Sequence, residues 1–295
     1  MRVISKPNEM QSIAESLRRE GKKIAVVPTM GYLHEGHISL IRKGSELAGI
    51  VITTLFVNPT QFGPNEDYEK YPRDFARDFK YAEDAGSDFL FNPVSDDIYQ
   101  EGYNTLISIS GITDKFEGAS RQRHFDGVAT IVAKLLNITK PHYAIFGQKD
   151  YQQTLVIKQL VRDFFFDLSV VVAPTVREAD GLALSSRNVY LSQDERRKAV
   201  ILFKALVEAE DAIQKGENRR KIINAILHNA IRSIPEIKID YASAADADTL
   251  EEPDVFLPGE HVILMLAVFN GKTRLIDNAL VTIPQDPQVK KHIFV

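Results

Sequence analysis

The chain has 295 residues, of which 44% are hydrophobic and 26% are charged, and its formal net charge at pH 7 is −4. This length suffices for a large hydrophobic core and for more than one domain. Acidic and basic side chains are well mixed, so no region has the charge of a nucleic-acid or anionic-membrane binding surface. The absence of cysteine excludes disulfides, thiolate catalysis and cysteine-ligated metal sites.

The sequence also bears on where the protein resides. No apolar run approaches the roughly 20 residues that a membrane-spanning helix needs. Residues 1–20 contain early acidic side chains and lack the apolar stretch of a signal peptide. We therefore expect a soluble cytoplasmic protein with neither a membrane nor nucleic acid as its partner.

The first part of the chain alternates short apolar runs with amphipathic segments. Strands are predicted, in chain order, at Ile24–Val27, Ile50–Val57, Asp88–Asn92, Thr105–Ser110, His142–Gly147 and Leu168–Ala173. Helices are predicted at Met10–Arg19, Ile38–Ala48, Asp74–Ala85, His124–Ile138 and Tyr151–Phe164. Alternation of this kind predicts an α/β fold, a Rossmann-like doubly wound parallel sheet with helices on both faces.

The pattern changes after about Thr175. Ser192–Glu195 is a capping-box sequence that opens a helix reaching about Gln214, and a second helix follows to Ser233. Three strands then follow one another without an intervening helix, at Lys238–Ser243, His261–Phe269 and Arg274–Thr282. Helices followed by a strand meander predict a separate, smaller α+β domain, so we divide the chain into residues 1–175 and 176–295.

The segment Val27–Ile41 has the strongest functional signature. A buried strand, a turn with two glycines and a helix start follow directly on one another, an arrangement that binds anions because the first helical N–H groups lack partners. His34 and His37 lie at this helix start. They are open to three interpretations: capping and packing, a metal pair, or neutral imidazoles that donate N–H to phosphate. Gly31 and Gly36 favour phosphate because glycine permits close approach of a ligand to the backbone.

Other strand ends carry polar side chains that fit the same interpretation. In the next strand–helix turn, Lys149 could supply charge to a phosphate and Gln153 a neutral amide, although an ordinary turn with a solvated lysine would look alike. At the domain junction, Ser185, Ser186 and Arg187 could hold phosphate oxygens or could form a plain polar linker.

Three further sets of side chains are weaker candidates. Asn58 and Gln61 present amides suited to a small polyol or carboxylate, or serve only the Asn-Pro turn. Asp78 could be a magnesium carboxylate or a solvated charge. Arg121 and His124 could add to an anion site or merely cap the helix that they precede.

Four segments closely resemble the motifs of the pantoate–β-alanine ligase family. They are PTMGYLHEGH at 28–37, FVNPTQFGPNEDYEKYPR at 56–73, FGQKDYQQ at 146–153 and DGLALSSRN at 180–188. The match runs through the whole chain in order. The HxGH part alone marks a wider superfamily of nucleotidyltransferases and class I aminoacyl-tRNA synthetases, whereas the four segments together are specific.

The resemblance implies a two-step ligation in an enzyme that is typically a homodimer. ATP and pantoate form an enzyme-bound pantoyl adenylate and pyrophosphate, and β-alanine then attacks the acyl group to release AMP and pantothenate. Mg²⁺ would accompany ATP. Residues 1–175 would bind ATP and pantoate. Because the acyl adenylate must be kept from water, we also expect residues 176–295 to close as a lid about a hinge at Arg177–Asn188.

The resemblance also assigns roles to individual residues. Catalysis would fall to His34, His37, Lys149 and Arg187, with His37 as the proton donor. ATP would be bound by Met30, Gly31, Tyr32, Leu33, His34, Glu35, Gly36, His37, Gly147, Gln148, Lys149, Asp150, Val176, Leu184, Ser185, Ser186 and Arg187. Substrate binding would involve Gln61 and Gln153. The residue types at Asn58, Arg121 and His124 suggest that these side chains also contribute to substrate binding. Asp78 would be the magnesium ligand.

Three alternative functions remain open on sequence alone. A nucleotidyltransferase would retain the nucleotide in its product, but the two glutamines and the absence of a base-reading segment disfavour it. A nicotinamide-dependent oxidoreductase would need a GxGxxG turn after the first strand, which is absent. A non-catalytic nucleotide-binding protein would leave the histidine, lysine and arginine set without a purpose.

Overall fold

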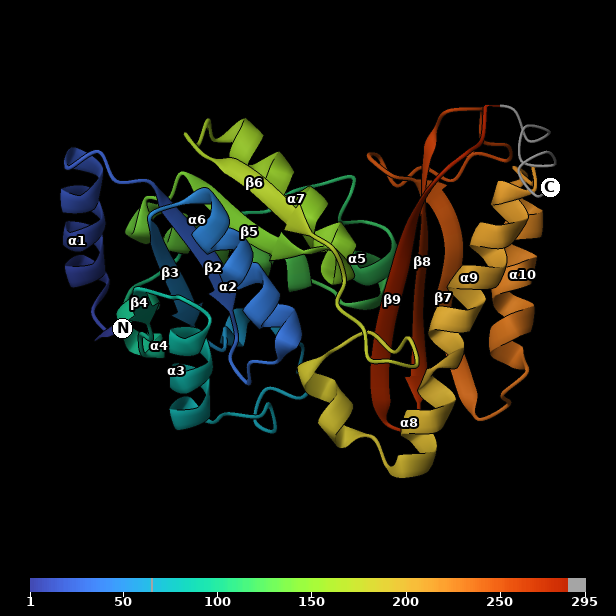
Figure 1. Ribbon diagram of the computed structural model, residues 1–295, viewed down its shortest axis with the longest axis horizontal. Coiled ribbons are helices and arrows are strands. Elements are labelled where there is room, and N and C mark those ends of the chain that lie inside the picture. The colour runs from blue at the N-terminus through green and yellow to red at the C-terminus, as the bar shows by residue number, and fades with distance from the viewer. Residues whose placement is uncertain (65, 286–295) are drawn as a thin grey trace, which may run out of the picture. The chain divides into compact units, whose positions relative to one another are not determined.

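The computed structural model describes residues 1–64 and 66–285 (Figure 1). The chain divides into two compact units, one of residues 1–176 with 184–186 and one of residues 177–183 with 187–295. Asn65, within the family-like segment 56–73, and the last ten residues of the predicted second domain lie outside the described residues.

The first unit is built on a six-stranded sheet in which every pair of neighbours is parallel. Its strand order is β1-β4-β3-β2-β5-β6. The strands are β1 (Arg2–Ile4), β2 (Ile24–Thr29), β3 (Ile50–Leu55), β4 (Phe89–Phe91), β5 (Tyr143–Gly147) and β6 (Ser169–Ala173). The order reverses between β2 and β5, and ligands bind beyond the carboxyl ends of the strands at such a switch point.

Helices cover both faces of this sheet (Figure 1). The helices are α1 (Pro7–Arg19), α2 (Glu35–Leu47), α3 (Phe75–Asp84), α4 (Ser95–Ile98), α5 (Phe116–Ser120), α6 (His124–Thr139) and α7 (Tyr151–Asp163). One apolar cluster joins α1, α6 and α7 to one face, and a second joins α2 and α3 to the other. Twelve of the 16 residues of α6 are buried, which makes it the central helix of the first cluster.

Several details of this unit differ from the sequence prediction, among them the short helices α4 and α5, which were not predicted. The strand expected at Thr105–Ser110 is wrong: this segment forms no ladder, and the Ile107 N–H donates instead to Thr130 Oγ1 on α6. Strand β1 was not predicted, because three residues are too short for a periodic signal. The parallel sheet itself is confirmed.

The second unit has a three-stranded antiparallel sheet in the order β7-β8-β9. Its elements are α8 (Gln193–Ala199), α9 (Ile201–Gln214), α10 (Arg220–Arg232), β7 (Ile237–Asp246), β8 (His261–Asn270) and β9 (Thr273–Thr282). Helices α9 and α10 pack on the sheet through a separate apolar cluster. The predicted long helix from Ser192 is divided at Val200 into α8 and α9, and the predicted α+β character is confirmed. No helix among the described residues is both long and apolar enough to cross a membrane.

Candidate active site

The turn between β2 and α2 has a backbone shape that few residues adopt. Gly31 has a φ of 90° and Tyr32 a φ of 52°, the left-handed region that favours glycine. A Cβ on Gly31 would lie 2.9 Å from Leu55 Cδ1. The buried Asp78 on α3 holds the turn, because its two oxygens accept the N–H of Tyr32 at 2.8 Å and of Leu33 at 2.7 Å. Thus α3 fixes the approach of the chain to α2.

His34 and His37 form a reciprocal capping box at the start of α2. His34 Nδ1 accepts the Gly36 N–H at 3.1 Å, and His37 Nδ1 accepts the His34 N–H at 3.3 Å. A backbone N–H can only donate, so both Nδ1 atoms carry a lone pair and both rings carry their proton on Nε2. The cap therefore fixes the tautomer and makes each Nε2–H available as a donor. The two histidines can thus cap the helix and also donate to a phosphate.

The surroundings keep both imidazoles neutral. Burial, reinforced by His37 and Lys149, lowers the pKa of His34 to about 2. Burial and the charge of Lys149 lower the pKa of His37 to about 4. The two rings lie with their centroids 4.1 Å apart, so two positive charges would repel one another. At neutral pH this helix start presents uncharged N–H donors beside a lysine.

Two of the other predicted phosphate segments lie in the same unit. Lys149 belongs to the short 3₁₀ turn Gln148–Asp150 that follows β5, and its influence on both histidine pKa values places its charge near them. Ser186 Oγ lies 3.3 Å from the Tyr32 carbonyl oxygen, and Leu184 Cβ lies 4.0 Å from where a Cβ on Gly36 would be. Arg187 belongs to the second unit, so its place at the phosphates stays a prediction.

The end of β3 holds Gln61 in a network of neutral groups. Asn58 Nδ2 donates to Gln61 Oε1 at 3.1 Å and to the Gly127 carbonyl oxygen at 3.2 Å. Gln61 Nε2 lies 3.0 Å from Met30 Sδ. A Cβ on Gly127 would lie 2.4 Å from the Thr60 carbonyl oxygen, so only glycine lets α6 approach this turn so closely. Asn58 and Gln61 are buried.

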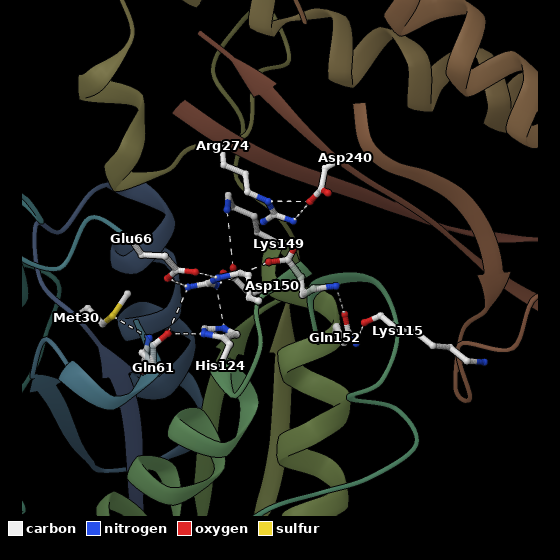
Figure 2. Close-up of polar contacts among 12 residues, drawn as sticks. Met30, Gln61, Glu66, Lys115, His124, Lys149, Asp150, Gln152, Asp240 and Arg274 are labelled. Carbon is white, nitrogen blue, oxygen red and sulfur yellow. Dashed lines mark hydrogen bonds and ion pairs between the residues drawn. The ribbon is translucent and has the colours of Figure 1, made fainter. Parts of the chain in front are cut away.

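Arg121 and His124 contact the main chain of Gln61. Figure 2 shows the His124 ring beside Gln61. The Arg121 guanidinium makes two hydrogen bonds to Glu66, at 2.7 and 2.6 Å, and a third to His124 Nε2 at 3.0 Å. Arginine can only donate, so His124 carries its proton on Nδ1 and donates it to the Gln61 carbonyl oxygen at 2.8 Å. Burial and the Arg121 charge lower the pKa of His124 to about 4. Both ring nitrogens of His124 are thus engaged within the protein.

Two neighbouring glutamines on α7 have different surroundings. Gln152 is buried and holds the segment before α5, since its amide donates to the carbonyls of Ile112 and Lys115 and accepts the Glu117 N–H. Figure 2 shows its contact with Lys115. Gln153, one residue further, is half-buried, and no hydrogen-bond partner for its side chain lies within the described part of the chain. Gln153 remains the one suited to a ligand.

The sequence did not indicate several residues that shape this site. Glu66, Tyr99 and Gly127 act on the predicted site residues Arg121, Asn58 and Gln61 through contacts between distant segments. The only local signal was that Glu66 lies in the long polar loop after β3, whose length already indicated function.

Asp78 was expected to bind Mg²⁺. It lines a cavity of about 290 Å³, together with Asp74 and Met30. Each of its oxygens accepts one N–H and retains a second lone pair, so a cation could still bind from the cavity. Nowhere in the described ranges do three histidine, aspartate or glutamate side chains gather to hold a metal. A magnesium ion here would take one protein carboxylate and would need phosphate and water for the rest of its shell.

Comparison with known proteins places this site in context. The family model described as pantoate-beta-alanine ligase matches residues 2–280. The pantothenate synthetase of Chlorobium phaeobacteroides is 48% identical over 285 residues, 97% of this chain and 99% of that protein. The crystal structure of pantothenate synthetase from Thermus thermophilus has a TM-score of 0.88 at 42% identity and covers 95% of this chain and 99% of that one.

A further solved structure carries ligands. The pantoate-beta-alanine ligase of Francisella tularensis, crystallised with an ATP compound and β-alanine, has a TM-score of 0.78 at 37% identity and covers 95% of this chain and 97% of that one. Because the family model and these relatives match nearly the whole chain, the chain belongs to the pantoate–β-alanine ligase family.

Proposed function

We propose that this protein joins pantoate to β-alanine with ATP, through a pantoyl adenylate, and releases AMP and pyrophosphate. The observation that supports this most directly is the pair of neutral Nε2–H donors that the His34–His37 capping box creates beside Lys149. A carboxylate and a triphosphate repel each other, and fixed N–H dipoles with a nearby cation reduce that repulsion without reorganisation.

In the first step a pantoate carboxylate oxygen attacks the α-phosphorus of ATP. The new P–O bond forms as the bond to pyrophosphate breaks, and negative charge grows on the leaving group. His37 and His34 donate hydrogen bonds from Nε2, and Lys149 and Arg187 supply positive charge. Since the pKa of His37 is lowered to about 4, the ring acts as a neutral donor at pH 7 and not as an imidazolium.

In the second step the β-alanine amine attacks the acyl carbon of the adenylate. The amide bond forms, the bond to AMP breaks, and the amine loses a proton. The substrates would be positioned by Gln61 and Gln153, with Asn58, Arg121 and His124 supporting them. The nucleotide would be held by Met30, Gly31, Tyr32, Leu33, Glu35, Gly36, Gly147, Gln148, Asp150, Val176, Leu184, Ser185 and Ser186, together with the catalytic residues.

Several broader assignments belong to the same proposal. Residues 1–175 would form the ATP- and pantoate-binding domain and residues 176–295 the lid, in a cytoplasmic homodimer. Small-angle scattering with and without ATP and pantoate tests lid closure, because a closing lid lowers the radius of gyration. Sedimentation tests the dimer.

The activity itself is tested with ATP, Mg²⁺, pantoate and β-alanine. We expect one AMP and one pyrophosphate for each pantothenate, and pantoate-dependent exchange of pyrophosphate into ATP when β-alanine is omitted. A product that retains the nucleotide would mean a nucleotidyltransferase, and no turnover of any kind would overturn the proposal.

Magnesium would neutralise charge on the triphosphate, and Asp78 would be its protein ligand. The variant Asp78→Asn separates this role from the turn-holding role. If Asp78 binds the ion, the Mg²⁺ concentration for half-maximal rate rises. If Asp78 serves only the turn, thermal stability falls while the Mg²⁺ dependence stays as in wild type.

A further inference from the structure

Which of the two Asn58 amide atoms is the nitrogen follows from a neighbouring group that can only accept. Asn58 is 1% exposed, and one of its amide atoms lies 3.2 Å from the Gly127 carbonyl oxygen. A carbonyl oxygen does not donate, so this amide atom must be the nitrogen. The assignment follows from chemistry and not from the placement of two atoms that look alike.

The other end of the Asn58 amide meets two hydroxyl groups. Tyr99 Oη donates to Asn58 Oδ1 at 2.6 Å, and Thr60 Oγ1 donates to the same oxygen at 3.0 Å. Burial raises the pKa of Tyr99 to about 12, so its hydroxyl remains a donor throughout the pH range of an assay. Lys134 Nζ lies 5.2 Å from the centre of the Tyr99 ring and holds it from one face.

The Asn58 amide in turn sets the Gln61 amide. Asn58 Nδ2 lies 3.1 Å from one atom of the Gln61 side chain, which must therefore be the acceptor Oε1. The Gln61 nitrogen then faces Met30 Sδ at 3.0 Å. A thioether is a weak acceptor, so this N–H would exchange it readily for an oxygen of a ligand.

From this chain of contacts we propose that Tyr99 is a positioning residue for the acid substrate: by holding Asn58, it orients Gln61 so that an amide N–H, and not the amide oxygen, meets an oxygen of pantoate. The inference rests on the proposed function, in which Gln61 binds pantoate. It adds that the site selects for a hydrogen-bond acceptor at this position. The Tyr99 hydroxyl contacts Asn58 Oδ1 and Thr60 Oγ1, so Tyr99 would act on Gln61 through these two neighbours.

The test compares two neighbouring tyrosines. Tyr99→Phe removes one of the two hydroxyl donors to Asn58 Oδ1 and leaves the donor of Thr60 in place. Tyr103→Phe removes a neighbouring hydroxyl that has no hydrogen-bond partner among residues 1–64 and 66–285, from a ring that packs 5.1 Å from that of Tyr99. We expect Tyr99→Phe to raise the KM for pantoate about fivefold, the value of one net hydrogen bond, and to leave the KM for ATP within about twofold. Tyr103→Phe is expected to change neither.

A second arm uses pantoate analogues in which one hydroxyl is replaced by hydrogen. If a pantoate hydroxyl accepts the Gln61 N–H, the fivefold rise in KM caused by Tyr99→Phe disappears for the analogue that lacks this hydroxyl. If the carboxylate accepts the N–H, the rise in KM persists for every analogue. The isosteric Gln61→Glu, which replaces the N–H by an oxygen, should raise the KM for pantoate at least as much as Gln61→Ala.

Some outcomes would overturn the inference. Equal KM increases for ATP and pantoate in Tyr99→Phe, the same increase in Tyr103→Phe, or a Gln61→Glu enzyme that binds pantoate normally would each do so. Failure of the proposed function looks different, because wild type would then form no pantothenate at all.

Discussion

Helices α2 and α6 both begin with histidines held neutral by burial, yet the two helix starts use them in opposite ways. In α2, His34 and His37 accept backbone N–H groups at Nδ1 and keep the proton on Nε2. In α6, His124 accepts from Arg121 at Nε2 and donates from Nδ1 to Gln61. The hydrogen-bond partner of one ring nitrogen decides the tautomer. The tautomer and the partner of the second nitrogen then decide whether the ring can donate to a ligand or is fully engaged by the protein.

In the proposed function this difference separates two tasks. The α2 start would offer two N–H donors to the phosphates, whereas both nitrogens of His124 at the α6 start are engaged by Arg121 and by the Gln61 carbonyl oxygen. Variants at α2 should therefore affect the chemical step, and variants at α6 should affect the binding of the acid.

The largest effect is expected at His37. His37→Ala should slow adenylation by about 100-fold or more, because a donor to the growing charge is lost. Pantoate-dependent pyrophosphate exchange measures this step. His37→Asn is the matched variant, since Asn Oδ1 can still accept the His34 N–H but no Nε2–H remains. It should restore the cap, worth about 1 kcal/mol, without restoring the rate. Full activity in either variant would remove the assigned role.

Gln61 should separate the two substrates. Gln61→Ala should raise the KM for pantoate by roughly tenfold to a hundredfold, because a hydrogen bond to an anionic ligand is lost. The KM for ATP should change little. Gln100→Ala, at an exposed glutamine, is the control. Equal losses for ATP and pantoate would contradict the distinction between the two helix starts.

Gly127 tests whether α6 positions the acid site by backbone contact. A Cβ there would lie 2.4 Å from the Thr60 oxygen and 2.7 Å from the Gln61 nitrogen, so Gly127→Ala must push the helix or the turn away. We expect a loss of about 2 kcal/mol in the free energy of unfolding and about a tenfold rise in the KM for pantoate. Gly49→Ala, where a Cβ would meet nothing within 4 Å, should be neutral. An unchanged KM would show that the turn tolerates displacement.

The last prediction concerns how stability depends on pH. The pKa of His124 is about 4 in the folded protein and about 6.5 in an unfolded chain, so the unfolded state binds the extra proton between these values. His124 therefore contributes stability above pH 6.5 that is lost as the pH falls toward 4, by about 3 kcal/mol at most. Denaturant unfolding across this range should give a flatter pH profile for His124→Asn than for wild type. Parallel profiles would mean that His124 titrates normally.

The sequence predicted the features that are local in the chain. The β2 run, the glycine turn and the α2 start follow one another, and the structure has them in that order. The division of the helix at Val200 and the ladder-free segment at Thr105–Ser110 depend on packing, so periodicity missed them. In the site, the links from Tyr99 to Asn58 and from Glu66 to Arg121 span 41 and 55 residues, and no local pattern records them.

The glycine contact of α6 limits how this protein could be altered. The backbone of α6 at Gly127 contacts the backbone of Thr60 and Gln61 directly, with no side chain between them that could be shortened or enlarged. The turn that carries Gln61 therefore cannot shift independently of α6. An enzyme redesigned for a longer or bulkier hydroxy acid would have to gain room on the Met30 side, and changes along α6 near Gly127 would cost stability before they altered selectivity.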